Sequence, residues 1–164
     1  MKKISKITVK RIADDSPDTS WLGEYSNKPN SEYSIDRKER GDQGSREYQY
    51  FNLPFENYKG IPKKEILKYC EQDYERIESF NKGNWYFLGI KVEAEIQTSK
   101  NGKEWLINRI SSGGLFGIES DSESSYFEEI EKEQINELKI QLLELGFSGK
   151  EIAEASKNIE RKES

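Results

Sequence analysis

Apolar and polar residues alternate most regularly between residues 84 and 98, and this alternation predicts a β-strand. The apolar positions of one face are Tyr86, Leu88, Ile90, Val92, Ala94 and Ile96. The other face begins with Trp85 and Phe87 and then becomes charged. Because successive side chains of a strand point to opposite faces, one face is predicted to be buried throughout and the other only at its start.

Two further strands are predicted from similar patterns. Asn101-Gly102 is a strong tight-turn signal, so residues 104–111 are expected to return as the partner strand. A two-residue loop would pair Ile96 with Ile107 and Thr98 with Trp105, which places apolar groups together. Residues 4–12 are rich in β-branched side chains and predict the first strand of the chain.

Helical spacing of apolar residues predicts three helices. Residues 62–80 carry Ile66, Cys70, Tyr74 and Ile77 on one face, behind Pro62 in the first turn. A long helix begins near residues 122–124, with Ser120–Glu123 or Ser125–Glu128 as its capping box, and ends at Gly146. Its apolar stripe is Phe127, Ile130, Leu138, Leu142 and Leu145. Ser148 and Glu151 would cap a short last helix, and residues 160–164 are expected to fray.

These elements predict an α+β fold. We expect an antiparallel sheet of three to five strands packed against the central helix, the long C-terminal helix and the short terminal helix. At 164 residues the chain is expected to form a single domain over residues 1–160. This domain would include an irregular, aromatic-rich loop region at about 20–60 and a helical part at about 122–160.

The composition excludes several kinds of chemistry. The chain has no histidine and one cysteine, Cys70, which rules out Ser-His-Asp triads, Cys-His pairs and Cys-rich zinc sites. We therefore expect no catalytic residues, no metal and no cofactor. Cys70 is expected to be a small buried apolar side chain. No stretch has the length of a membrane span, and a cytoplasmic location without membrane attachment is expected.

Charge is distributed unevenly along the chain. Residues 1–12 have a net charge of +5 and residues 117–164 a net charge of −7, within an overall charge of −5. A broad basic face for duplex nucleic acid is therefore not favoured.

A glycine-rich segment, residues 111–117, lies between a predicted strand and the long helix. Gly113 and Gly114 allow close approach of another backbone, and the N–H groups near a helix start can hold an anion. Glu119 and Asp121 would repel a phosphate, and a tight structural connection explains the glycines equally. Together with Glu123, these two acids could instead bind a hard cation, although a helix dipole stabilises such acids without metal.

Two other groups of residues are candidate sites. Glu93 and Glu95 share a strand face and could act as an acid–base pair, but a solvated sheet face explains them more simply. In the aromatic-rich segment, Arg37, Arg40 and Arg46 lie near Tyr48 and Tyr50. Arginine and tyrosine side chains close together can bind single-stranded nucleic acid or form part of a protein interface. The near-neutral charge of residues 21–59 favours the protein interface, and most of these rings could simply pack in the core.

The residues Ile110-Ser111-Ser112-Gly113-Gly114-Leu115-Phe116-Gly117-Ile118-Glu119-Ser120-Asp121-Ser122, with Tyr126 and the strand after Gly89, resemble a family of small proteins from bacteriophages, prophages and plasmids. The family often has tryptophan where this chain has Phe116. The resemblance covers about residues 68–147 and brings no known activity with it. It implies a mobile-element setting, in which small acidic proteins often bind a host factor or defence complex.

We therefore expect stoichiometric binding to a host or defence-system protein, with inhibition of a nucleoprotein complex in the manner of an anti-CRISPR protein as a specific form. The expected contact residues are Gly113, Gly114, Leu115, Phe116, Glu119, Asp121, Glu128, Glu129, Arg37, Arg40, Tyr48 and Tyr50. One alternative is direct nucleic-acid binding through the basic N-terminus and the aromatic segment. Another is a carboxylate-dependent enzyme that uses Glu93, Glu95, Glu119 and Asp121.

Overall fold

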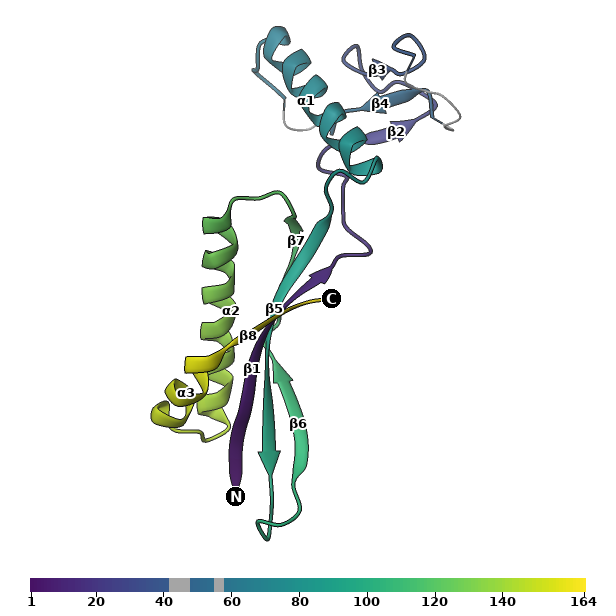
Figure 1. The fold of residues 1–164 in the computed structure, drawn as a ribbon. Helices are drawn as coiled ribbons and strands as arrows, with labels where there is room; N and C mark the ends of the chain where they lie inside the picture. The colour runs from purple at the N-terminus through teal and green to yellow at the C-terminus, as the bar shows by residue number, and fades with distance from the viewer. Residues whose placement is uncertain (42–47, 55–57) are drawn as a thin grey trace. The chain divides into compact units, whose positions relative to one another are not determined.

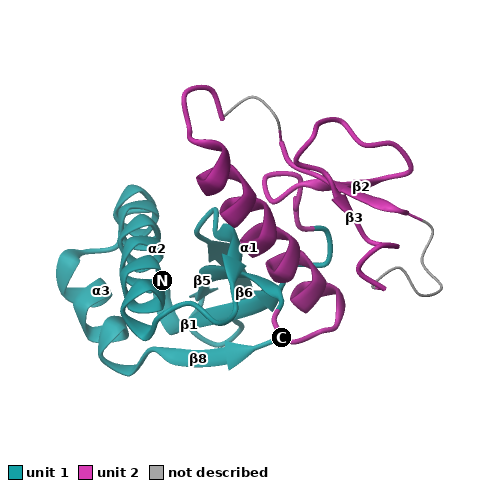
Figure 2. Cartoon of the chain, turned by 90° about the horizontal axis from the view of Figure 1, so that it is seen from above, with its two compact units in different colours: residues 1–16, 86–164 teal, residues 17–85 magenta. Residues whose placement is uncertain are grey.

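The structure, a computed structural model, describes residues 1–41, 48–54 and 58–164 and has the α+β composition expected from the sequence. Its contacts divide the chain into two compact units, residues 1–16 with 86–164 and residues 17–85 (Figures 1 and 2). We expected one domain over residues 1–160. Each of the two compact units has its own cluster of buried apolar side chains.

Unit 1 contains a five-stranded sheet in the order β6-β5-β1-β8, in which β7 also pairs with β5. The strands are β1 (Lys2–Ala13), β5 (Phe87–Thr98), β6 (Leu106–Ser111), β7 (Leu115–Glu119) and β8 (Glu160–Glu163). β6 pairs with the C-terminal half of β5 and β7 with its N-terminal half, so both lie on the same edge of β5. All these pairs are antiparallel except β1–β8.

A β-bulge at Ser5 explains an irregular apolar pattern in β1. Ile4 pairs with Ile96 and Lys6 with Glu95, so Ser5 is the additional residue. The bulge allows Ile4 and Ile7, three positions apart, both to contribute to the core cluster of unit 1. Strict alternation would have sent one of the two toward the polar face.

The observed register of the β5–β6 hairpin differs from the predicted register by one residue. Ile96 pairs with Asn108, and Thr98 with Leu106. The loop is longer than two residues because side chains organise it: Asn101 accepts the N–H groups of Lys103 and Glu104, and Ser99 accepts that of Gly102. A one-residue shift exchanges the faces of a strand, so Ile107 lies on the polar face and not opposite Ile96.

Two helices of unit 1 agree with the sequence pattern. α2 (Ser124–Glu144) buries Phe127, Ile130, Leu138 and Leu142, and it ends before Gly146, which has a φ of 84°. Neither predicted capping box is present, because the N-cap of α2 is Glu123, whose side chain forms no capping hydrogen bond. Leu145, which was predicted in the apolar stripe, is exposed. α3 (Gly149–Ala155) has the predicted capping box between Ser148 and Glu151.

The last residues were expected to fray and instead form β8, which follows a short 3-10 helix, η2 (Ser156–Asn158). β8 runs parallel to β1 and pairs with Thr8–Arg11. Arg161 of β8 also forms an ion pair with Glu131 of α2 at 3.2 Å. A long-range partner of this kind leaves no local sequence signal, which is why periodicity could not predict β8.

Unit 2 contains a small sheet in the order β2-β4-β3 and one helix. The elements are β2 (Glu24–Ser26), β3 (Ile35–Asp36), β4 (Tyr50–Asn52) and α1 (Lys63–Asn81). The predicted apolar face of α1 is buried, but against Leu22 and Phe51 of its own unit and not in the core cluster of the larger sheet. Arg46 and Phe55 of the aromatic-rich segment lie outside the described residues. None of the described helices is both long enough and apolar enough to cross a membrane.

Candidate protein-binding surfaces

The glycine-rich segment is a corner where β6 leaves β5 and β7 takes its place. Ser112 accepts the N–H of Val92 with its hydroxyl at 2.9 Å and donates its own N–H to the Val92 carbonyl. The next two N–H groups bind α2: Gly113 donates to Glu137 at 2.7 Å and Gly114 to Gln134 at 2.9 Å. Side chains of α2 therefore bind both glycine N–H groups, and this supports the structural reading of the segment.

The ring of Phe116 covers the backbone of β5 at Gly89. A Cβ atom at Gly89 would lie 2.3 Å from two ring carbons, which no real side chain tolerates. Gly114, with a φ of 83°, borders the same ring. An aromatic ring over a strand glycine shields backbone that would otherwise be exposed. Phe116 nevertheless remains 48% exposed, so part of its ring is available to a partner.

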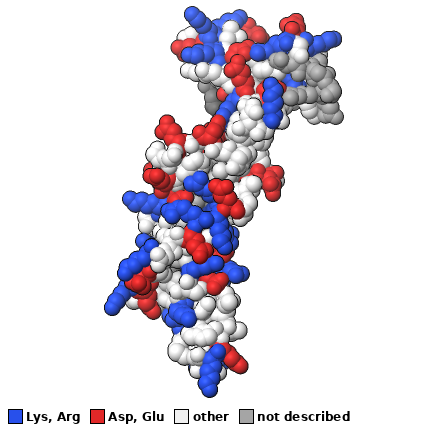
Figure 3. Space-filling view, in the orientation of Figure 1, with Lys and Arg blue, Asp and Glu red and all other residues white. Residues whose placement is uncertain are grey.

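The outer edge formed by β6 and β7 carries four exposed apolar side chains. Leu106 is 72% exposed and Ile107 is 56% exposed, and on β7 Leu115 and Phe116 are also exposed. β6 and β7 each pair with β5 on one side only, and the described residues provide no strand for the other side. In Figure 3 an uncharged area lies just above the blue and red side chains at the lower tip of the view. We call this surface the β6–β7 edge.

The acidic residues around α2 are divided between the interior and the surface. Glu128 and Glu129 are exposed, as the sequence led us to expect for a contact surface, and Glu133 is exposed with them. Glu131 is buried between Arg11 and Arg161, at 3.3 and 3.2 Å, and Glu137 binds the Gly113 N–H. Figure 3 shows red and blue side chains interspersed on the visible face. The acidic surface is therefore smaller than the sequence suggests.

The acids that follow β7 do not assemble into a metal site. Glu119 ends β7 and is half-buried, whereas Asp121 is exposed in the turn before α2. Within residues 1–41, 48–54 and 58–164, no three acidic or cysteine side chains come together in a way that could hold a metal ion. The observed positions thus give no support to the cation-site hypothesis.

The basic residues of β1 all have partners within unit 1. Lys2 donates to the Leu145 carbonyl and lies over the ring of Phe147, and Lys3 lies 4.4 Å from the centre of the Trp105 ring. The remaining three form ion pairs: Lys6 with Glu160, Lys10 with Glu93 and Arg11 with Glu131. These contacts reduce the positive charge available to a nucleic acid.

Glu93 and Glu95 also lie in ion pairs. Arg109 approaches both carboxylates, at 3.7 and 3.3 Å, and Glu95 accepts the Ser5 hydroxyl at 2.8 Å. The Ser5 hydrogen bond, supported by Arg109, lowers the pKa of Glu95. An acid catalyst at neutral pH requires a raised carboxyl pKa, so this arrangement does not favour the enzyme alternative.

The predicted contact residues of unit 2 separate into buried and exposed groups. Arg37 is 1% exposed, and its guanidinium donates to the Tyr74 hydroxyl, the Tyr48 carbonyl and Glu78. It is part of the interior and is not available to a partner. Sequence alone gave no sign of this, because a buried arginine is rare unless it is paired.

The other predicted residues of unit 2 lie nearer the surface. Arg40 is exposed and pairs with Glu71 at 2.6 Å, Tyr48 is exposed, and Tyr50 is half-buried. The ring of Tyr48 stacks against Tyr25 at 6.5 Å between centroids. Cys70 is buried as predicted, and burial raises the pKa of its thiol to about 12. The aromatic residues thus serve mainly the core of unit 2.

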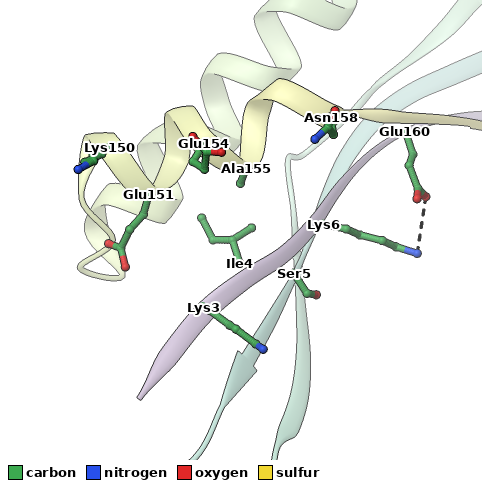
Figure 4. A pocket seen from close by; sticks show the side chains of 10 residues that line it. All are labelled: Lys3, Ile4, Ser5, Lys6, Lys150, Glu151, Glu154, Ala155, Asn158 and Glu160. Carbon is green, nitrogen blue, oxygen red and sulfur yellow. Dashed lines mark ion pairs between the residues drawn. The ribbon is translucent and has the colours of Figure 1, made fainter.

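A hollow of about 710 Å³ lies between β1 and α3, and sequence reasoning missed it. Figure 4 shows Ile4 pointing toward Ala155 of α3, while Lys3 and Ser5 point away from that helix. Lys6 reaches along the strand to Glu160. We call this hollow the β1–α3 groove. Its lining includes Ser5 and Glu160, and neither the bulge at Ser5 nor β8 was predictable from the pattern of residues.

Comparison of the chain with protein-family models, with curated proteins and with solved structures gave no match. What the chain does must therefore be inferred from its own residues.

Proposed function

We propose that the chain acts by stoichiometric binding to another protein, and that the β6–β7 edge is its main contact surface. The observation that carries the proposal is the exposure of Leu106, Ile107, Leu115 and Phe116 on strands that, among the described residues, pair on one side only. Natural proteins usually protect such edges with charges, prolines or covering elements, because an apolar edge recruits other chains. An exposed group of apolar residues is also a common mark of a protein interface.

The geometry of this edge favours recognition by strand addition. A partner strand would take up the unpaired N–H and C=O groups of β6, and its side chains would meet Leu106 on one face of the sheet and Ile107 on the other. The ring of Phe116 packs on the backbone of Gly89 and would add an aromatic contact near the end of the β6–β7 edge. Aromatic residues of this kind are enriched at interface hot spots.

The resemblance to mobile-element proteins extends the proposal to a cytoplasmic host or defence-system protein as the partner. The specific form, inhibition of a nucleoprotein complex, would also use exposed acids of α2 such as Glu128 and Glu129. These acids could approach a basic surface of such a complex once the edge is bound.

The test is a capture experiment with a matched pair of variants. Immobilised wild-type chain is exposed to bacterial lysate, retained proteins are identified by mass spectrometry, and the candidate is purified and mixed with the chain. Light scattering after gel filtration should then give a complex of fixed stoichiometry. The edge variant Leu106→Ser/Ile107→Ser should lose the partner, whereas Leu143→Ser, which changes an exposed leucine on α2, should retain it.

Three results would count against the proposal. They are retention of chaperones alone, equal retention by the edge variant, and loss of the partner with Leu143→Ser only. A mass that corresponds to a homodimer of the chain without any partner would assign the edge to self-association instead.

A further inference from the structure

One edge of β1 is only partly occupied. β1 pairs with β5 from Lys2 to Ala13, but β8 pairs with β1 only over Thr8–Arg11. Over Lys2–Ile7, therefore, the described residues provide no strand on the β8 side. At about 3.3 Å per residue, these six residues leave roughly 20 Å of unpaired strand edge.

The backbone at Ile7, on the β8 side of the bulge at Ser5, is oriented to accept another strand. The Arg11 carbonyl accepts the N–H of Ser164, and the Ala13 N–H points to the Ser164 carbonyl, so these residues face the β8 side. Because backbone direction alternates along a strand, the N–H and C=O of Ile7 face the same side. β8 shows that this edge accepts a parallel strand, and its pairing ends where the free segment begins.

The β1–α3 groove lies beside this free edge. Its apolar floor includes Ile4 and Ala155, both partly buried at the margin of the core cluster. An added strand would alternate its side chains between this floor and the polar face of the sheet. The floor therefore favours apolar residues at every second position.

Two lysines lie on the polar side of the edge, beside the acids Glu95 and Glu160. Lys3 and Lys6 pair with Gln97 and Glu95 in the ladder and so share the polar face. The link between Lys6 and Glu160 is 3.7 Å long and largely exposed, which makes it a weak pair that a stronger acid contact could replace.

The acids of the groove are engaged elsewhere. Glu151 accepts the Ser148 N–H in the capping box, and Glu154 pairs with Lys157 at 2.6 Å. A strand added to β1 would meet Lys3 and Lys6 on its polar side, with Glu160 beside Lys6.

We propose that the β1–α3 groove binds an extended segment of a partner protein in which acidic and apolar residues alternate. The segment adds to β1 in line with β8, with its apolar side chains over Ile4 and Ala155 and its carboxylates toward Lys3 and Lys6. A second copy of β1 fits poorly, because self-pairing would bring lysines close together. This site lies on the opposite edge of the sheet from the β6–β7 edge and does not depend on the function proposed for that edge.

The experiment uses the full chain and a fluorescein-labelled six-residue peptide that alternates glutamate and valine. Fluorescence anisotropy should show saturable binding of this peptide. Two control peptides should bind at least tenfold more weakly: one that alternates lysine and valine, and a glutamate–valine peptide with proline at its central positions. Lys3→Glu/Lys6→Glu should weaken binding at least tenfold. Lys103→Glu, an exposed lysine of the hairpin loop, is the matched control and should bind as wild type does.

Amide NMR locates the peptide. The proposal requires shift changes centred on Ile4, Ile7 and Ala155. It is overturned by an absence of saturable binding, by equal binding to the double lysine variant, or by shift changes centred on β6. A single-stranded oligonucleotide that binds the same residues more tightly than the peptide would also overturn it.

Discussion

Replacing Glu131 with glutamine should loosen β8, because this carboxylate connects three elements of unit 1. Its side chain is 7% exposed and pairs with Arg11 of β1 at 3.3 Å and with Arg161 of β8 at 3.2 Å. All four residues of β8 are exposed and none is apolar. The strand is thus held mainly by its pairing with Thr8–Arg11 and by Arg161.

The magnitude follows from the exposure of the two arginines. A hydrogen bond to a charged group contributes about 1.5–3 kcal/mol, whereas an exposed ion pair contributes about 0–1 kcal/mol. The Arg11 side chain is 35% exposed and that of Arg161 is 62% exposed, so water would solvate both once the carboxylate is gone. Only the Arg161 pair joins α2 to β8, so we expect Glu131→Gln to cost about 1–2 kcal/mol in the stability of β8.

Hydrogen exchange followed by mass spectrometry measures this directly. Because about 1.4 kcal/mol corresponds to a tenfold change in an equilibrium, the amides of β8 should exchange about 5- to 30-fold faster in Glu131→Gln. Glu129→Gln, at an exposed position of the same helix, is the control and should exchange as wild type does. Equal exchange in both variants would refute the reasoning, and so would β8 amides that are already unprotected in the wild type.

Two further predictions concern close packing and a buried thiol. Gly89→Ala should destabilise unit 1 by about 1–3 kcal/mol in urea denaturation, because its Cβ meets the Phe116 ring at 2.3 Å. In a Phe116→Ala background the same change should be neutral or stabilising, and equal costs in both backgrounds would contradict the contact. Burial raises the pKa of Cys70 from 9.0 to about 12, so its thiolate fraction at pH 8 should fall about a thousandfold. Reaction with a disulfide reagent should be correspondingly slower in the native than in the urea-unfolded chain, and similar rates would show that Cys70 is accessible.

Local periodicity was sufficient to predict which face of several elements is buried. The apolar face of β5 from Leu88 to Ile96, the buried face of α1 and the capping box at Ser148 were predicted correctly. Tyr86 was predicted on the same face as Leu88, but it lies before β5 and is 55% exposed. The hairpin register was wrong by one position, because Ser99 and Asn101 stabilise a longer loop than Asn101-Gly102 implies. Side-chain hydrogen bonds of this kind compete with the two-residue turn and carry little sequence signal.

Long-range contacts account for what the sequence did not predict. β8 depends on β1 and Glu131, which lie far from it along the chain. Arg37 was expected at the surface, but it is enclosed by residues of α1 and the loop before β4. In the candidate site, Leu115 and Phe116 were identified from the glycine-rich motif, and the structure adds Leu106 and Ile107 beside them on the same edge of β5.

The most direct test of protein binding through the β6–β7 edge is hydrogen exchange of the chain with and without its captured partner. Strand addition predicts that amides of Leu106–Ser111 become strongly protected in the complex, with smaller protection in Leu115–Glu119. Protection confined to unit 2, or no protection anywhere in a complex of defined stoichiometry, would contradict the central claim.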